Sequence, residues 1–278
     1  MSDVTAEQVQ AADARLQQAS DTGSPCAPVR DLIGATDQDA AYAVQSLRTA
    51  RRLAEGRHLV GHKIGLTSPA VQQQLGVDSP DYGALFDDMM YADREPIDLG
   101  RFLQPKVEAE IAFVLGSDID CPAAHVSDVI RATAFVLPAI EIVDSRIAGW
   151  DISIADTIAD NASSGAVVLG TGPRSLDGFD LTEVGMSLEF DGDVQSTGTG
   201  AACLGSSVIA VAWLARALAH RGTPLRAGEV ILSGALGPMV AAQPGVFRAR
   251  LHGLGDVRAD FRASVSSSST SPTNGAQS

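Results

Sequence analysis

Apolar and polar residues alternate most clearly over residues 105–115, which read PKVEAEIAFVL. This alternation, together with the Val, Ile and Phe content, predicts a β-strand. Because neighbouring side chains of a strand point to opposite faces, Glu108 and Glu110 share one face, about 6–7 Å apart along the chain. The same face continues with apolar Ala112 and Val114. The pattern leaves two interpretations open: exposed glutamates on a half-buried strand, or a pair of carboxylates that binds a cation.

Helical periodicity characterises the N-terminal part of the chain. The residues from Thr5 to Gln8 form a capping-box pattern that begins a helix running to about Ser20. A second helix begins within 36–39 and ends at Gly56. Further along we expect strands at 58–66, 139–143, 166–169, 186–190, 229–233, 247–251 and 257–261, helices at 127–137 and 206–220, a short helix between 67 and 76, and turns at 76–88.

These elements predict an α+β chain in three parts. Residues 1–57 form a helical annex, residues 58–262 a β-rich catalytic domain, and residues 263–278 a Ser-rich tail with almost no core-forming side chains, expected to be disordered. The strands are unevenly spaced with few helices between them. A mixed and mostly antiparallel β core is therefore expected, in place of a regular parallel one.

Composition and charge narrow the range of partners. The 278 residues carry a formal net charge of −14, which argues against nucleic acid and anionic membranes as partners. An anionic substrate would need a local reversal of this field, which a divalent cation provides. No apolar run is expected to reach the length of a membrane span, and no signal peptide is apparent, so we expect a cytoplasmic protein. Cys26, Cys121 and Cys203 have no metal-site or disulfide spacing and are expected to be reduced thiols.

A third glutamate lies in an apolar strand pattern. Glu141 is flanked by Ile140 and Ile142, and a buried carboxylate without a partner is costly. The alternative is an edge strand whose glutamate faces water. Together Glu108, Glu110 and Glu141 make a carboxylate set suited to Mg²⁺ or Mn²⁺, which prefer oxygen ligands, whereas zinc is disfavoured because no His or Cys lies near.

Lys63 and Asp78 are candidates for proton transfer. Lys63 lies in the strand at 58–66 between Gly61 and Gly65, and it is either an exposed strand residue or a partly desolvated acid–base group. Asp78 precedes Ser-Pro, and on its residues alone it is best explained as a turn-forming aspartate.

Two glycine-containing turns could bind a substrate carboxylate through hydroxyl and backbone N–H groups, or could simply be turns. One spans 161–165 and the other 233–238. The candidate substrate-binding residues are Asn161, Ser163, Ser164, Ala235 and Leu236.

In their order and spacing, several segments resemble the hydratase/decarboxylase branch of the fumarylacetoacetate hydrolase superfamily. The resemblance covers almost the whole chain except the Ser-rich tail. The segments are VGHKIGLTS at 60–68, VQQQLGVD at 71–78, QPKVEAEI at 104–111, LPAIE at 137–141, DNAS at 160–163 and LSGALGPM at 232–239.

The resemblance implies roles for individual residues. The E-x-E pair and the later glutamate hold a divalent metal, which maps onto Glu108, Glu110 and Glu141. The lysine of the G-x-K-I-G-L motif maps onto Lys63, as a proton-transfer residue. The aspartate of the L-G-V-D motif maps onto Asp78, which polarises Lys63 or water. The implied fold is a mixed β roll or sandwich with a helical N-terminal part, in a homo-oligomer.

The implied reaction is the addition of water to 2-hydroxypenta-2,4-dienoate, giving 4-hydroxy-2-oxopentanoate, in the meta-cleavage degradation of aromatic compounds. Two alternatives stay open. One is decarboxylation of 4-oxalocrotonate, and the other is a non-catalytic scaffold that partners such an enzyme. The resemblance also raises association with a downstream aldolase or a sister decarboxylase.

Overall fold

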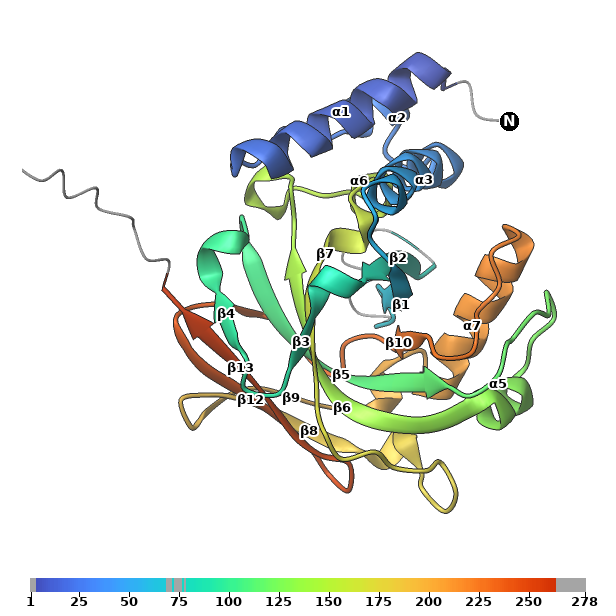
Figure 1. Ribbon diagram of the computed structural model, residues 1–278, viewed down its shortest axis with the longest axis vertical. Coiled ribbons are helices and arrows are strands. Elements are labelled where there is room, and N and C mark those ends of the chain that lie inside the picture. Colours follow the sequence, from blue (N-terminus) through green and yellow to red (C-terminus); the bar gives the residue numbers. More distant parts are fainter. Residues whose placement is uncertain (1–3, 69–71, 73–76, 78, 264–278) are drawn as a thin grey trace, which may run out of the picture.

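The protein forms a layer of N-terminal helices above two curved β-sheets (Figure 1). The structure is a computed structural model, and it describes residues 4–68, 72, 77 and 79–263. The short helix expected between 67 and 76 falls largely outside these residues, as does the tail expected from residue 263 onward.

The helical annex follows the predicted pattern. Thr5 caps the first helix by accepting a hydrogen bond from the Gln8 backbone N–H, and the Gln8 side chain accepts one from the Thr5 N–H. At the start of α3, the Asp37 side chain accepts a hydrogen bond from the Ala40 backbone N–H. The buried sides of α1 and α3 join the main core, so the domain boundary at residue 57 stays a prediction. The helices are α1 (Ala6–Thr22), α2 (Arg30–Ile33) and α3 (Gln38–Ala54).

The larger sheet has the strand order β2-β1-β10-β5-β6-β7-β3, with β11 also paired to β5. Most of its strand pairs are antiparallel, and β1–β10 and β3–β7 are parallel, so the expected mixed core is confirmed. Its strands are β1 (Leu59–Gly65), β2 (Asp81–Phe86), β3 (Met90–Ala92), β5 (Pro105–Leu115), β6 (Thr133–Asp144), β7 (Ser164–Leu169), β10 (Val230–Leu232) and β11 (Val240–Ala241).

The smaller sheet packs against the larger one, with β12 and β13 in contact with β6. Its order is β4-β13-β12-β8-β9. Its strands are β4 (Pro96–Asp98), β8 (Gly185–Phe190), β9 (Asp193–Thr199), β12 (Gly245–Leu251) and β13 (Gly255–Arg262). The remaining helices and turns are α5 (Val126–Ala132), α6 (Ile154–Ala159), α7 (Ser207–His220), η1 (Asp87–Met89), η2 (Leu99–Arg101), η3 (Ala148–Trp150), η4 (Asn161–Ser163), η5 (Leu181–Glu183) and η6 (Gly200–Ala202).

Strand β5 separates the hydrophobic core from the acidic face. Its residues Ile111 and Phe113 are fully buried in the main core, together with Phe247 and Phe261 of the smaller sheet. Because side chains alternate along a strand, the even-numbered residues, including Glu108, point to the opposite face.

The helix expected at 127–137 is wrong in its second half. Helix α5 ends at Ala132, and β6 begins at Thr133 and continues through Pro138. The strand continues through Pro138 because pairing of β6 with β7 ends at Ala139, the residue after the proline. The Pro138 carbonyl accepts a hydrogen bond from the Gly170 N–H at 2.9 Å, which shows that the backbone of Pro138 faces the β7 side. The N–H that proline lacks therefore falls at the end of the β6–β7 ladder, where its loss costs least.

The turns expected at 76–88 are also incorrect in part. Strand β2 begins at Asp81, is buried along its whole length and pairs antiparallel with β1. The sequence pattern did not indicate this strand because Gly83 is typical of turns and not of strands. A Cβ at Gly83 would lie 2.3 Å from the Asn161 carbonyl oxygen, so the close approach of these two segments requires glycine.

Contrary to the expectation that no apolar run is long enough, the segment Gly200–His220 has the length and composition of a membrane span. In this fold, however, α7 is a core helix. Its residues Val211, Leu214 and Leu218 are buried in the main core. All three cysteines are free thiols, as predicted.

Candidate metal centre

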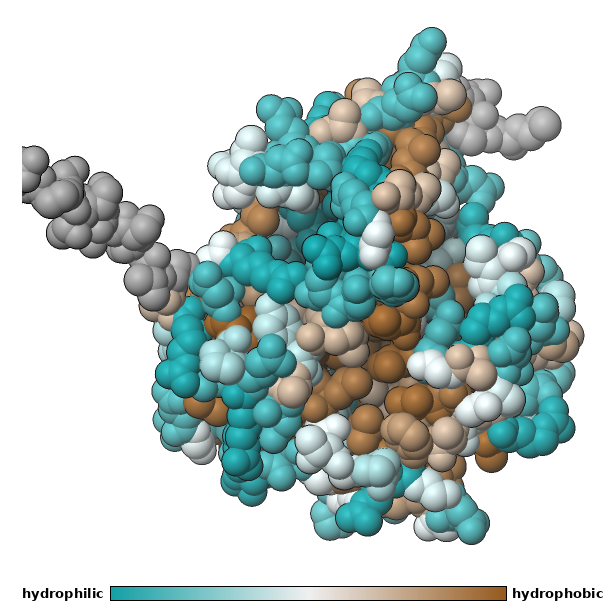
Figure 2. All heavy atoms as spheres, viewed as in Figure 1, coloured by the Kyte–Doolittle hydropathy of each residue, from teal (hydrophilic) through white to brown (hydrophobic). Residues whose placement is uncertain are grey.

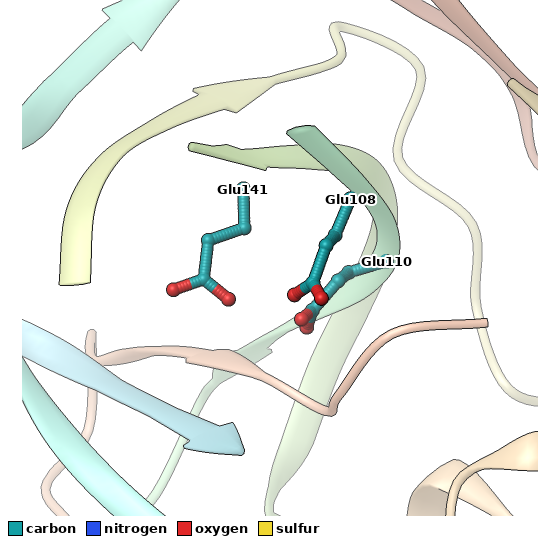
Figure 3. A group of neighbouring side chains, drawn as sticks. All are labelled: Glu108, Glu110 and Glu141. Carbon is teal, nitrogen blue, oxygen red and sulfur yellow. The ribbon is translucent and has the colours of Figure 1, made fainter. Parts of the chain in front are cut away.

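The three predicted glutamates converge on one face of the larger sheet. Glu108 of β5 lies directly opposite Glu141 of β6, and Glu110 is two residues further along the same face of β5. One oxygen from each of the three side chains lies within 4.8 Å of the other two. Figure 3 shows the carboxylates from the two adjacent strands pointing toward a common region.

The carboxylates are poorly satisfied by the protein itself. Glu110 and Glu141 are fully buried, while Glu108 is partly exposed. The Gly234 N–H donates to Glu110 Oε2 at 2.7 Å. Glu110 Oε1 and Glu141 Oε2 are buried without a hydrogen-bond partner among the described residues, and Glu141 Oε1 has the ammonium group of Lys63 at 3.2 Å. Because buried polar groups without partners are costly, a cation among these oxygens would offset a penalty that the fold otherwise carries.

Burial and the short distances between the carboxylates raise the pKa values of Glu108 and Glu110. Burial, and then the charge of Glu141, raise the pKa of Glu108 to about 7. Burial and the two neighbouring glutamates raise the pKa of Glu110 well above its ordinary value. Three carboxylates at this spacing cannot all ionise cheaply without a counter-charge. An all-oxygen donor set of this kind fits a hard divalent cation.

Lys63, the predicted proton-transfer residue, lies beside these carboxylates. It is buried in β1, and its Nζ lies 3.2 Å from Glu141 Oε1. Burial lowers the pKa of Lys63, but the negative charges of Glu141 and Asp81 outweigh that effect and the pKa is raised overall. Lys63 is therefore an ammonium group at neutral pH, placed directly beside the carboxylates.

Asp81 is the residue that the sequence reasoning missed. It is buried at the start of β2, where its Oδ2 accepts a hydrogen bond from Thr157 Oγ1 at 3.1 Å and its Oδ1 has no partner among the described residues. A Cβ at Gly65 would lie 2.1 Å from Asp81 Oδ1, so this glycine leaves the space that the carboxylate occupies. The predicted Asp78 lies outside the described residues.

The predicted polar turn at η4 has a strained backbone. Asn161, Ala162 and Ser163 have φ values of 58°, 51° and 52°, which are unfavourable for residues other than glycine. The Asn161 side chain donates to and accepts from the backbone of Ala84, and Ser164 Oγ donates to the Asn161 carbonyl oxygen at 2.7 Å. The Ser163 hydroxyl is buried and has no partner in the described part of the chain.

The second predicted turn supports β5 beside the acidic face. The Leu236 N–H donates to the Ala109 carbonyl oxygen at 3.0 Å, and the Ser233 N–H donates to the Ile111 carbonyl oxygen at 3.2 Å. Gly234, between them, is the residue that donates to Glu110. Ala235 therefore lies next to the residue that binds a glutamate of the centre, and its role in substrate binding stays a prediction.

Comparison with known proteins identifies relatives along nearly the whole chain. Residues 60–262 match the family described as fumarylacetoacetate (FAA) hydrolase C-terminal. The chain is 55% identical over 261 residues to a 2-keto-4-pentenoate hydratase of Paraburkholderia xenovorans (strain LB400), a match that covers 94% of this chain and 97% of that protein. It is 58% identical over 247 residues to a TodF product hydratase of Pseudomonas putida, with 88% and 92% covered.

A solved structure shares the fold. The 4-oxalocrotonate decarboxylase from Pseudomonas putida G7, complexed with magnesium and adipate, superposes with a TM-score of 0.90 at 36% sequence identity, covering 94% of this chain and 100% of that one. These likenesses confirm the predicted α+β fold, a mixed β roll with a helical N-terminal part.

Proposed function

The chain belongs to the fumarylacetoacetate hydrolase family, and we propose that it is a divalent-metal-dependent hydratase. It adds water to 2-hydroxypenta-2,4-dienoate and releases 4-hydroxy-2-oxopentanoate. One observation carries the proposal: the convergent carboxylates of Glu108, Glu110 and Glu141 lie in a chain that is 55% identical to a named hydratase. The reaction belongs to the degradation of aromatic compounds.

Glu108, Glu110 and Glu141 would hold the cation, for which Mg²⁺ and Mn²⁺ are our candidates. When bound, such a cation supplies positive charge and acts as a Lewis acid toward the substrate's carboxylate and 2-oxygen. The buried Glu110 Oε1 and Glu141 Oε2, which have no hydrogen-bond partner among the described residues, support this assignment. The arrangement also explains how a protein with a net charge of −14 accepts an anionic substrate.

Lys63 is our candidate for the proton carrier. Protonation of the dienol at C5, with loss of the 2-hydroxyl proton, gives an unsaturated 2-oxo acid. Water then adds at C4, and a proton is delivered to C3. Lys63 is held as an ammonium by Glu141 and Asp81, so it has a proton to donate. A cation bound to Glu141 would offset the negative charge that raises the pKa of Lys63 and would bring that pKa closer to the range that proton transfer requires.

The remaining proposed residues bind or orient the substrate. Ser163 is the strongest of them, because its buried hydroxyl has no partner among the described residues. The side chains of Asn161 and Ser164 form hydrogen bonds within the protein, and they stay candidates together with Ala235 and Leu236. Asp78, as a residue that polarises Lys63 or water, also stays a proposal. Asp81, in contact with Thr157, is better placed for that role within the described chain.

Decarboxylation of 4-oxalocrotonate is the second candidate, favoured by the TM-score of 0.90 to a decarboxylase. The sequence identity to that protein is 36%, against 55% and 58% to the named hydratases, and for that reason we rank hydration first.

We also propose a homo-oligomer in the cytoplasm, which associates with the downstream aldolase or a sister decarboxylase. Partly exposed apolar side chains support the oligomer. They lie on strands of the larger sheet and pack against its second, smaller core cluster, and Figure 2 shows an apolar band on the surface of the molecule. The residues are Val60, Met90, Val114, Phe135, Leu169 and Val230. Light scattering of the purified protein during size-exclusion chromatography tests this proposal, and a monomeric mass would contradict it.

One assay separates the candidate functions. The purified chain is supplied with Mg²⁺ or Mn²⁺ and given the freshly prepared dienol or, separately, 4-oxalocrotonate. We expect 4-hydroxy-2-oxopentanoate from the dienol, and loss of that activity in EDTA. Release of CO₂ from 4-oxalocrotonate alone would favour the decarboxylase, and no turnover of either substrate would favour a scaffold. Full activity in EDTA would refute the metal-dependent mechanism.

A further inference from the structure

A second cavity lies between the helical annex and the larger sheet. It has a volume of about 240 Å³ and is lined by residues of α1, α3, β2, η1, η2, η4, the end of β6 and the start of β7. Its described lining includes none of the three glutamates, Lys63 or Asp81. It does include Asn161 and Ser164, the substrate-binding candidates named above, whose side chains form hydrogen bonds within the protein. Four arginines line it, although the protein as a whole is acidic: Arg48, Arg52, Arg101 and Arg146.

Three of these arginines form ion pairs with nearby carboxylates. Arg52 and Arg101 both form ion pairs with Asp88. Arg146 donates from Nε to Asp160 Oδ1 at 2.5 Å and from Nη2 to the Asp160 carbonyl oxygen at 2.7 Å. Each of the three therefore has a carboxylate partner within the protein, although Arg52 and Arg101 share that of Asp88.

Arg48 is different. It forms no hydrogen bond or ion pair with any residue that the structure describes, and its Nη1 atom is buried. The carboxylates of Asp160 and Asp13 act on it only through their charge, and each pairs directly with another arginine. Burial lowers the pKa of Arg48 to about 10, so the guanidinium still carries its charge at neutral pH. Burial of Nη1 without a hydrogen-bond partner or a direct counter-ion is costly, and this donor is free to bind an anion.

The nearest acids of the lining do not supply that counter-ion. The Asp144 oxygens accept hydrogen bonds from the backbone N–H groups of Leu103 and Gln104, at 2.6–3.1 Å. Glu55 is exposed. The cavity thus contains one partly buried guanidinium, that of Arg48, whose buried Nη1 has no hydrogen-bond partner within the described chain.

The rest of the wall indicates the kind of anion. Phe86, Met89 and Phe102 contribute apolar surface to the same cavity. A planar guanidinium matches a carboxylate through two parallel hydrogen bonds, and apolar walls favour a hydrocarbon chain attached to it. We propose that this cavity binds a small organic carboxylate, with its carboxylate on Arg48 and its alkyl group against Phe86, Met89 and Phe102.

Butyrate is a suitable probe because it has no 2-oxo group with which to chelate a metal. The full-length protein in EDTA is titrated with butyrate by calorimetry, with sodium chloride and inorganic phosphate as comparison anions. We expect saturable butyrate binding, and an affinity about tenfold weaker in Arg48→Gln, because a charge-assisted pair is lost. Arg48→Lys retains the positive charge but lacks the paired N–H donors of a guanidinium, so we expect this variant to bind butyrate with intermediate affinity.

Two matched variants serve as controls for the role of Arg48. Arg131→Gln removes an exposed arginine of α5 and should leave the affinity unchanged. Glu141→Gln alters the acidic centre and should also leave it unchanged. Thermal melting of each variant verifies that it is folded, and butyrate should raise the melting temperature of the wild type more than that of Arg48→Gln.

Three results would overturn the proposal. Equal butyrate affinity in folded Arg48→Gln would remove Arg48 from the site. Loss of binding in Glu141→Gln would place butyrate at the acidic centre. Equal affinity for phosphate or chloride would show an unselective anion site in place of one for organic carboxylates.

Discussion

Glu108 and Glu141 face each other directly across the antiparallel ladder of β5 and β6. Like charges at directly opposite positions destabilise a sheet, and burial strengthens the repulsion. Glu110 lies on the same face and adds a third carboxylate. A cation bound among these carboxylates would offset the repulsion, and several consequences of that proposal can be measured.

Removing one of the paired carboxylates should abolish metal-dependent turnover. Glu141→Gln keeps the side-chain volume but loses the charge, so we expect metal affinity to fall more than ~100-fold, beyond the loss typical of residues that only orient ligands. Calorimetric titration with Mn²⁺ measures this affinity directly. The exposed Glu183→Gln is the control and should behave as wild type. Unchanged Mn²⁺ affinity in Glu141→Gln would remove this residue from the metal site.

Replacing Lys63 should separate chemistry from metal binding. Lys63→Met fills a similar volume without a transferable proton, so kcat should fall about 10²–10⁴-fold, the usual contribution of a positioned acid–base group. Metal affinity should hold or increase, because the competing ammonium 3.2 Å from Glu141 is gone. Steady-state kinetics and metal titration of the same preparation test both statements. A variant with full kcat would show that the proton travels by another route.

The metal-free protein should lose stability as the pH rises. Burial raises the pKa of Glu108 from 4.5 to about 7 in the folded state. The folded state therefore binds more protons than the unfolded state between these values, and the free energy of unfolding falls with rising pH. Melting temperatures in EDTA should be higher at pH 5.5 than at pH 8. Mg²⁺ should restore stability at pH 8, and Glu108→Gln should weaken the pH dependence. A melting temperature independent of pH would contradict the assigned pKa shift.

Asp156 should be essential for docking the annex. Its buried carboxylate accepts hydrogen bonds from the N–H groups of Val29 and Arg30, from the Arg30 guanidinium and from Ser153, at 2.8–2.9 Å. Asp156→Asn removes the charge that strengthens these hydrogen bonds, while Arg30 keeps its exposed partner Asp151, so we expect a loss of about 1.5–3 kcal/mol in urea unfolding. Asp151→Asn removes an exposed partner of the same arginine and should have little effect. Similar stability of the two variants would show that Asp156 is not the anchor.

The sequence alone determined those helices and strands whose defining residues lie close together in the chain. The capping box at Thr5 and Gln8 specified the start of α1, because both partners are within one helical turn. The alternation over 105–115 specified β5 and placed Glu108 and Glu110 on one face, because strand geometry fixes which side chains share a side. The family resemblance, and not the spacing, indicated the reaction.

The tertiary structure decided what the strands bring together. The register of β5 with β6 places Glu141 opposite Glu108, and the position of β1 brings Lys63 to the same carboxylates. The sequence alone did not identify Asp81 or Arg48 as functional candidates, because the surroundings of each come from residues distant in the sequence. Asp81 accepts a hydrogen bond from Thr157, and Arg48 lines a cavity that forms only when α3 packs in the folded chain. Burial, charge and hydrogen-bond satisfaction arise from such long-range contacts, and no local pattern encodes them.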